Sequence, residues 1–223
     1  MAAFVAFESA IELKKAQKAN RVTVGRTSPE EFRKLFEQSA GDPEDWLALA
    51  EGLKLAAEIL LPAFDKQFDE VRKKGTPYGI IMKGVGAVGV YSLPQVYLLL
   101  AGYAIEDLLK GILIAQDPSR VKDGKLLGWG GKEHDLIGLC ELADIEMNDA
   151  TAELFKRLSV FIQWGGRYPT PKISEKMPPR PLYEGGHGPM LYWLSSDPKV
   201  FTDVFGQLSG ILRRAKSRSR KTT

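Results

Sequence analysis

A nearly unbroken apolar run from Pro94 to Gln116 constrains this chain more than any other stretch. Its hydrophobic side chains would cover more than one side of a helix, which is typical of a helix buried inside a bundle. Pro94 suits a first helical turn, because an N–H group in that turn has no intrahelical partner. At the other end, Pro118 disfavours helical geometry for the preceding residue, Asp117. We therefore predict a buried central helix over residues 94–116.

Three charged residues, Glu106, Asp107 and Lys110, lie within this run. Burying an unpaired charge is costly, so we expect these residues to be paired, at a cleft or at the edge of the domain. A membrane-spanning role is disfavoured, because each Asp or Lys near the middle of a spanning helix costs about 2.5–3.5 kcal/mol. The run therefore predicts a core helix and no membrane partner.

Composition places the chain among ordinary globular proteins. Of its 223 residues, 26% are charged and 44% are apolar, which allows one large domain with a sizeable core. The single cysteine, Cys140, excludes an intrachain disulfide and fits a reducing cytoplasm. With only two histidines beside it, a four-ligand zinc site of Cys and His is excluded. The N-terminal residues do not follow the pattern of a signal peptide. We expect a cytoplasmic protein without a metal or cofactor.

Further helices are predicted on both sides of the central run. Ser28, Pro29 and Glu31 form the pattern of a capping box at the start of a helix that ends near Gly41. Hydrophobic residues at helical spacing predict the remaining helices over residues 43–73, 134–143, 149–164 and 197–215. Pro62 should kink the first of these or split it in two. A short helix over residues 3–18 and a brief extended segment over 20–26 are weaker predictions.

Glycine and proline mark the connecting segments, over residues 75–93, 118–132 and 169–189. The first contains Gly84, Gly86 and Gly89 in a dinucleotide-like spacing, but no strand–helix–strand pattern surrounds it, so a loop or hairpin is predicted. Strand signals are few. We therefore predict an all-α fold, an up-and-down antiparallel helical bundle with long loops rich in Gly and Pro. The predicted domains are an N-terminal helical extension, the bundle and a basic tail, over residues 1–41, 42–216 and 217–223.

Three short clusters contain most of the residues with functional chemistry. They are Glu106-x-x-x-Lys110, His134-Asp135-Leu136 and Gly166-Arg167-Tyr168-Pro169. In this order they resemble the HEPN family of helical domains, and the resemblance covers roughly residues 46–171. It implies a bundle of four or five helices, frequent dimerisation, and links to nucleotide or RNA binding. On this resemblance we expect a homodimeric module of a bacterial defence or toxin–antitoxin type system.

Two interpretations remain open for each cluster. Glu106 and Lys110 have the favourable order and spacing for a helix-stabilising pair. Alternatively, Glu106 or Asp107 holds Arg167 in a bidentate contact and orients it toward phosphate. His134 either caps or packs at a helix start or acts as a general base. Arg167 either binds phosphate with its planar fork of donors or forms a structural salt bridge.

Catalysis is a rival interpretation. Ribonuclease members of the HEPN family carry an Arg followed by four to six residues and a His. Residues 172–174, at that distance from Arg167, are Lys, Ile and Ser. Arg180 and His187 have six residues between them, but they lie in the segment rich in Pro and Gly. A metal-independent endoribonuclease would use Arg180 with His187 or Arg167 with His134.

The ligand-binding candidates are the acidic, basic and aromatic residues of the first and third clusters, Glu106, Asp107, Lys110, Arg167 and Tyr168. A third alternative is a structural dimer in which the charged residues form an internal salt-bridge network. Six positive charges lie within the last eleven residues. This tail is either a phosphate-binding arm or a solvated helix end.

Overall fold

The computed structural model describes residues 28–73, 87–168, 172–173, 180–181, 187–188 and 195–219. Contacts divide the chain into two units, Met1–Phe36 and Glu37–Thr223. The α-helices of the described residues are α2 (Pro29–Gly41), α3 (Pro43–Lys73), α4 (Ala87–Gln116), α5 (Leu136–Leu142), α6 (Asp149–Val160) and α7 (Asp197–Ser219). The chain is mostly helical, as predicted.

The remaining elements are short. A 3₁₀ helix, η2 (Pro118–Arg120), follows α4, and a π-helical turn, η3 (Phe161–Gly165), continues α6. Two antiparallel pairs of two-residue strands are β1 (Val121–Lys122) with β2 (Lys125–Leu126), and β3 (Arg180–Pro181) with β4 (His187–Gly188). Among the described helices, none has the length and apolar character needed to cross a bilayer.

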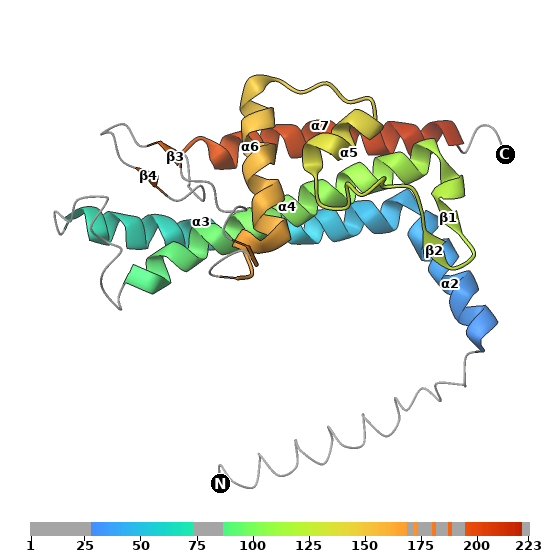
Figure 1. Cartoon of the computed structure of the whole chain (residues 1–223), viewed down its shortest axis with the longest axis horizontal. Helices are drawn as coiled ribbons and strands as arrows, with labels where there is room; N and C mark the ends of the chain where they lie inside the picture. The colour runs from blue at the N-terminus through green and yellow to red at the C-terminus, as the bar shows by residue number, and fades with distance from the viewer. Residues whose placement is uncertain are drawn as a thin grey trace, which may run out of the picture. The chain divides into compact units, whose positions relative to one another are not determined.

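Helix α4 is the centre of the second unit. It contacts α3, α5, α6, α7 and η3. The chain direction in Figure 1 shows α3 running antiparallel to α4, α7 running in the direction of α4, and α6 crossing them. The most deeply buried side chains of α4 are those of Tyr97, Leu98, Ala101, Ala104, Ile105, Leu108, Leu109, Ile112, Leu113 and Ile114. The predicted central core helix is therefore confirmed.

Glycines let the neighbouring helices approach α4 closely. A Cβ atom added at Gly102 would lie 2.5 Å from Cγ2 of Ile162 in η3. One added at Gly111 would lie 2.8 Å from Cβ of Trp46 in α3. Such distances are far shorter than a van der Waals contact, so both helix crossings depend on the missing side chain.

A buried ion pair joins α6 to α7. Arg157 donates to both carboxylate oxygens of Asp197, at 2.7 and 2.6 Å, and the two residues are only 3% and 1% exposed. A bidentate contact of this kind is strong and geometrically specific. The sequence patterns placed Asp197 only at the start of the helix predicted over residues 197–215, and they did not identify Arg157.

The predicted capping box at the start of α2 is confirmed. The Glu31 N–H donates to Ser28 Oγ at 3.2 Å, and the Ser28 N–H donates to Glu31 Oε2 at 2.6 Å, which completes a capping box. At the start of α6, the Thr151 N–H donates to Oδ1 of Asn148 at 2.9 Å. Each of these two helices thus has a side-chain oxygen that accepts a backbone N–H of its first turn.

Two predictions based on proline and glycine are wrong. Helix α4 begins at Ala87, so Pro94 lies inside the helix and residues 87–93 are not part of a loop. Helix α3 continues through Pro62, so the alternative in which this proline splits the helix does not occur, and the alternative of a kink stays a prediction. A proline removes one backbone hydrogen bond, and the packing of both helices on each other compensates for that loss. The predicted elements over residues 3–18 and 20–26, with Gly84 and Gly86, lie outside the described residues.

Candidate functional site

Glu106 joins two of the three predicted clusters. Its side chain is 6% exposed, and Oε1 accepts a hydrogen bond from Lys110 Nζ at 2.5 Å. The other oxygen, Oε2, lies 2.9 Å from Nδ1 of His134. A carboxylate only accepts, so Nδ1 is the donor and carries the proton in this pair. Nε2 of His134 has no hydrogen-bond partner among the described residues, and the side chain is 42% exposed. The imidazole is therefore fixed on one side and accessible on the other.

The loop between η2 and α5 holds His134 in place. Trp129 is 8% exposed, and its ring centroid lies 5.5 Å from Lys110 Nζ and 6.0 Å from Cζ of Arg120. These contacts fix the loop on the C-terminal half of α4 through cation–π attraction. At the start of α5, the Leu136 N–H donates to Oγ of Ser159 in α6 at 3.0 Å.

His134 does not cap α5. The N-cap residue is Asp135, and its side chain makes no capping hydrogen bond. The capping alternative for His134 is thus wrong, whereas its packing against a neighbouring helix is confirmed, because the imidazole binds the Glu106 carboxylate of α4, 28 residues away in sequence.

Asp107 is a second partly buried acid beside this pair. Burial, and then the neighbouring charge of Glu106, raise the pKa of its carboxyl from an ordinary 3.8 to about 7, while Lys110 acts in the opposite direction. No hydrogen bond or ion pair joins Asp107 to another of the described residues. A carboxyl with a pKa of about 7 is protonated about half of the time at pH 7, so Asp107 adds only part of a negative charge there.

The third cluster follows the π-helical turn η3. Arg167 is exposed, and its Nη2 donates to the backbone oxygen of Gln163 at 2.5 Å. Its guanidinium carbon lies 5.6 Å from the ring centroid of Tyr168, which is 54% exposed. The alternative in which Glu106 or Asp107 holds Arg167 does not occur among the described contacts, because the oxygens of Glu106 bind Lys110 and His134.

Gln163 connects the second and third clusters. Its Nε2 donates to the backbone oxygen of His134 over a long 3.5 Å, and its own backbone oxygen accepts from Arg167. We call the exposed surface formed by His134, Gln163, Arg167 and Tyr168 the His134–Arg167 patch. Sequence reasoning did not identify Gln163. Its only signal was its position, four residues before Arg167 and so on the same side of the helix.

The other predicted catalytic pair lies in the short β3–β4 hairpin. The register pairs Arg180 with Gly188 and Pro181 with His187. Arg180 and His187 are therefore one position apart on facing strands. Their catalytic role stays a prediction.

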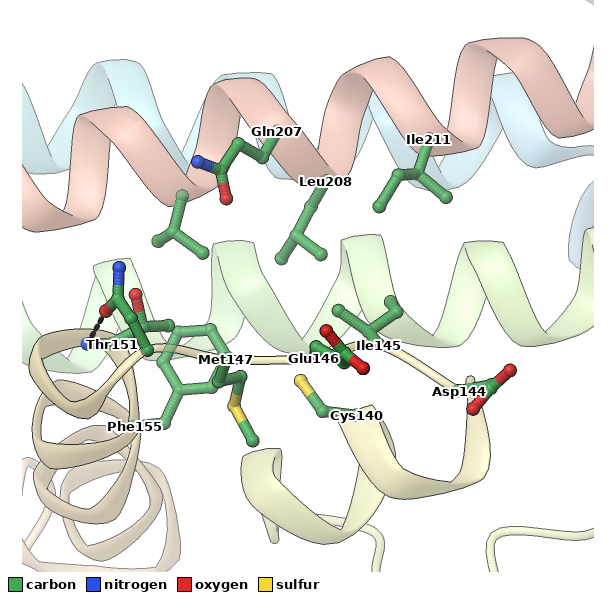
Figure 2. Close-up of a pocket in the computed structure, with 12 residues that line it drawn as sticks. Cys140, Asp144, Ile145, Glu146, Met147, Thr151, Phe155, Gln207, Leu208 and Ile211 are labelled. Carbon is green, nitrogen blue, oxygen red and sulfur yellow. Dashed lines mark hydrogen bonds between the residues drawn. The ribbon is translucent and has the colours of Figure 1, made fainter.

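A cavity of about 240 Å³ lies between α7, the start of α6 and the segment that follows α5 (Figure 2). Its lining includes Cys140, Phe155 and Leu208, which are buried, and the exposed acids Asp144 and Glu146. Burial raises the pKa of the Cys140 thiol to about 12, so this group stays protonated and is a poor nucleophile. The carboxylates of Asp144 and Glu146 in the lining of the cavity also disfavour an anionic ligand. None of the predicted site residues lines this cavity.

No group of three or more His, Cys, Asp or Glu residues within the described part of the chain is arranged to hold a metal ion. Comparisons with protein-family models, with curated proteins and with solved structures gave no match to this chain. The resemblance to HEPN domains therefore depends on the three sequence clusters alone.

Proposed function

We propose that this chain is a HEPN-like helical bundle whose His134–Arg167 patch binds phosphate groups of RNA or a nucleotide, as part of a bacterial defence or toxin–antitoxin type system. The observation that carries the proposal is the connection made by Gln163. Its side chain donates to the backbone oxygen of His134, and its own backbone oxygen accepts from the guanidinium of Arg167, 33 residues away from His134 in sequence. This link supports a joint surface of the accessible imidazole and the exposed guanidinium.

The charges of the patch favour an anion. Glu106 is balanced by Lys110 at 2.5 Å, and Asp107, with its pKa of about 7, is only partly ionised at neutral pH. Arg167 adds a full positive charge that no carboxylate among the described residues neutralises. Its guanidinium has five donors in a planar fork, of which one is bound by Gln163, so the others can bind phosphate oxygens.

Tyr168 favours RNA over free phosphate. Its ring is half exposed beside Arg167. Unpaired bases stack on such aromatic side chains, and each stacked base contributes about 1–3 kcal/mol. A patch that offers one phosphate contact and one stacking surface suits single-stranded RNA, with a mononucleotide as the smaller alternative.

The second candidate function is metal-independent RNA cleavage, which the Glu106–His134 pair favours. With Nδ1 bound to Glu106, His134 can accept the proton of a ribose 2′-hydroxyl at Nε2. The 2′-oxygen then attacks the adjacent phosphorus and forms a 2′,3′-cyclic phosphate. The bond to the 5′-oxygen breaks, and that oxygen leaves after taking a proton from water. Arg167 would stabilise the charge on the phosphoryl oxygens.

A binding titration with a fluorescent single-stranded RNA tests the proposal. We expect Arg167→Ala to weaken binding and to reduce the slope of log affinity against log salt by about 0.7, the value for one lost contact with a single strand. The fold should persist, because exposed charges contribute little stability. Arg33→Ala, which removes an exposed arginine from α2, is the matched control and should leave the affinity unchanged.

Equal effects of the two arginine substitutions would contradict the phosphate site. The same samples separate the two functions. If the chain cleaves RNA, His134→Gln should abolish cleavage while RNA is still bound. An RNA that stays intact with the wild-type protein would reject the second function and leave the first.

A further inference from the structure

Helix α3 has an exposed apolar face. Leu49, Leu55 and Ile59 are 56%, 59% and 67% exposed. The small residues between and beside them are exposed as well. We call this surface the α3 stripe, formed by Ala48, Leu49, Gly52, Leu55, Ala56, Ile59, Pro62 and Ala63. These positions recur every three or four residues and so lie along one side of the helix. Exposed aliphatic surface of this extent marks an interaction site.

Charged residues of α3 lie beside the stripe or at its ends. Glu51 binds Arg213 of α7 at 2.7 Å, and Lys54 binds Glu58 at 2.5 Å, which places these charges on the flank next to α7. The stripe itself contains no charged residue between Asp45 and Lys66. Both of these end residues are exposed and lie on the same side of the helix as the stripe.

Two copies of the α3 stripe that run in opposite directions are complementary to each other. About a midpoint between residues 55 and 56, Asp45 corresponds to Lys66, so an acid faces a base at each end. Residue size matches in the same register. Gly52 corresponds to Ile59, and Leu55 corresponds to Ala56, so a large side chain faces a small one. One choice of midpoint thus pairs opposite charges at both ends and a large with a small side chain near the axis, while the outer apolar pairs are Ala48 with Ala63 and Leu49 with Pro62.

We infer that the α3 stripe is the contact face of a homodimer in which two copies of α3 pack antiparallel around a two-fold axis near Leu55 and Ala56. A two-fold contact uses the same surface of both copies and requires self-complementarity of this kind. From Asp45 to Lys66 the helix extends for about 30 Å at 1.5 Å per residue, which is about the diameter of a small domain. The inference does not depend on the proposed function, because α3 contributes no residue to the His134–Arg167 patch.

Charge reversal of the full-length chain, followed by analytical ultracentrifugation, tests the dimer. Asp45→Lys places bases at both ends of the stripe, and Lys66→Asp places acids at both ends. Each variant alone should dimerise at least tenfold more weakly than the wild type. An equimolar mixture of the two should recover the wild-type affinity, since each end then pairs an acid with a base. Lys172→Asp, at an exposed lysine elsewhere, is the control and should change nothing.

Crosslinking measures the register independently. Ala56→Cys lies beside the proposed axis, so a short thiol-specific crosslinker should join two copies covalently. Ala48→Cys lies about 11 Å from the axis, at 1.5 Å per residue, and should not react with its own counterpart. Cys140 is fully buried and provides no competing thiol.

Several results would overturn the inference. A wild-type chain that is monomeric at every concentration would show that another segment of the chain, or a different protein, covers the stripe. A dimer that is insensitive to both charge reversals would place the interface elsewhere. A dimer in which Ala48→Cys crosslinks and Ala56→Cys does not would reject the antiparallel register. Circular dichroism of each variant confirms that it is folded.

Discussion

Among the single residues, Glu106 has the largest part in holding the site together, because it binds both Lys110 and His134. It is a carboxylate in the core, and its two oxygens bind one residue of its own helix and one from a distant loop. Its pair with Lys110 followed from the spacing of the sequence. The contact between Glu106 and His134 could not be predicted in this way. The two residues are 28 positions apart, and no local pattern indicates that the chain brings them together. Gln163 was missed for a related reason, since a neutral amide carries no signal of its role.

Lys110→Met should destabilise the protein by about 3–5 kcal/mol, because it leaves a buried carboxylate with only partial compensation. The matched control is Lys54→Met in the Lys54–Glu58 pair, which has the same spacing and the same 2.5 Å distance but side chains that are 23% and 35% exposed. That change should cost less than about 1 kcal/mol. Urea denaturation measures both, and equal losses would contradict the central position of Glu106.

Asp107 should make stability depend on pH. Its folded pKa of about 7 lies above the ordinary value of 3.8, so the folded state holds more protons between these values. Stability should therefore fall as pH rises from about 4 to about 7, and the loss should be complete above the folded pKa. Asp107→Asn should remove this part of the dependence and stabilise the protein at pH 8.

Asp117→Asn is the control, because the pKa of Asp117 is shifted in the opposite direction to that of Asp107. Hydrogen bonds from Ser119, the side-chain one first, lower the pKa of Asp117. Its contribution to stability is present above the ordinary pKa and is lost as pH falls through the folded value. Thermal melts from pH 3 to pH 8 compare the three proteins, and a wild-type profile that matches that of Asp107→Asn would contradict the assignment.

Among the helices, the spacing of hydrophobic residues along one helix could be predicted from the sequence. Helix ends that depend on packing against other helices could not. The predicted ends of α3, at residues 43 and 73, agree with the structure because charged and capping residues mark both. The start of α4 was predicted seven residues too late, because Pro94 was taken as a helix start. The contacts of Gly102 and Gly111 with other helices could not be predicted, since a glycine carries no signal for the element that will approach it.

Gly102→Ala should destabilise the protein by about 1–3 kcal/mol. The added methyl would lie 2.5 Å from Cγ2 of Ile162 and 3.4 Å from the backbone oxygen of Leu158, and such overpacking forces side chains to move. Gly206→Ala in α7 is the control. It has no neighbour within 4 Å and should gain up to about 1 kcal/mol from helix propensity. A gain in melting temperature for both variants would contradict the close crossing of η3 over α4.

Across the second unit, two exposed surfaces stand out. This unit is organised around α4, whose Glu106 binds His134 of the neighbouring loop. The His134–Arg167 patch lies beside this contact and combines His134 with Gln163 of η3 and with Arg167 and Tyr168, which follow η3. Helix α3 covers another part of α4 and leaves its own apolar stripe exposed. A dimer formed through α3 would therefore present two copies of the patch without using any of its residues.

On the proposed function, His134 and Arg167 lie in one RNA-binding site, with Arg167 as the phosphate contact. Nuclear magnetic resonance of the ¹⁵N-labelled chain tests it directly, with the side-chain signals of both residues followed during titration with a short single-stranded RNA. We expect the His134 Nε2 and Arg167 guanidinium signals to shift together and to yield one dissociation constant, while the Arg33 signals do not move. Shifts at only one of the two residues, or equal shifts at Arg33, would contradict a joint site.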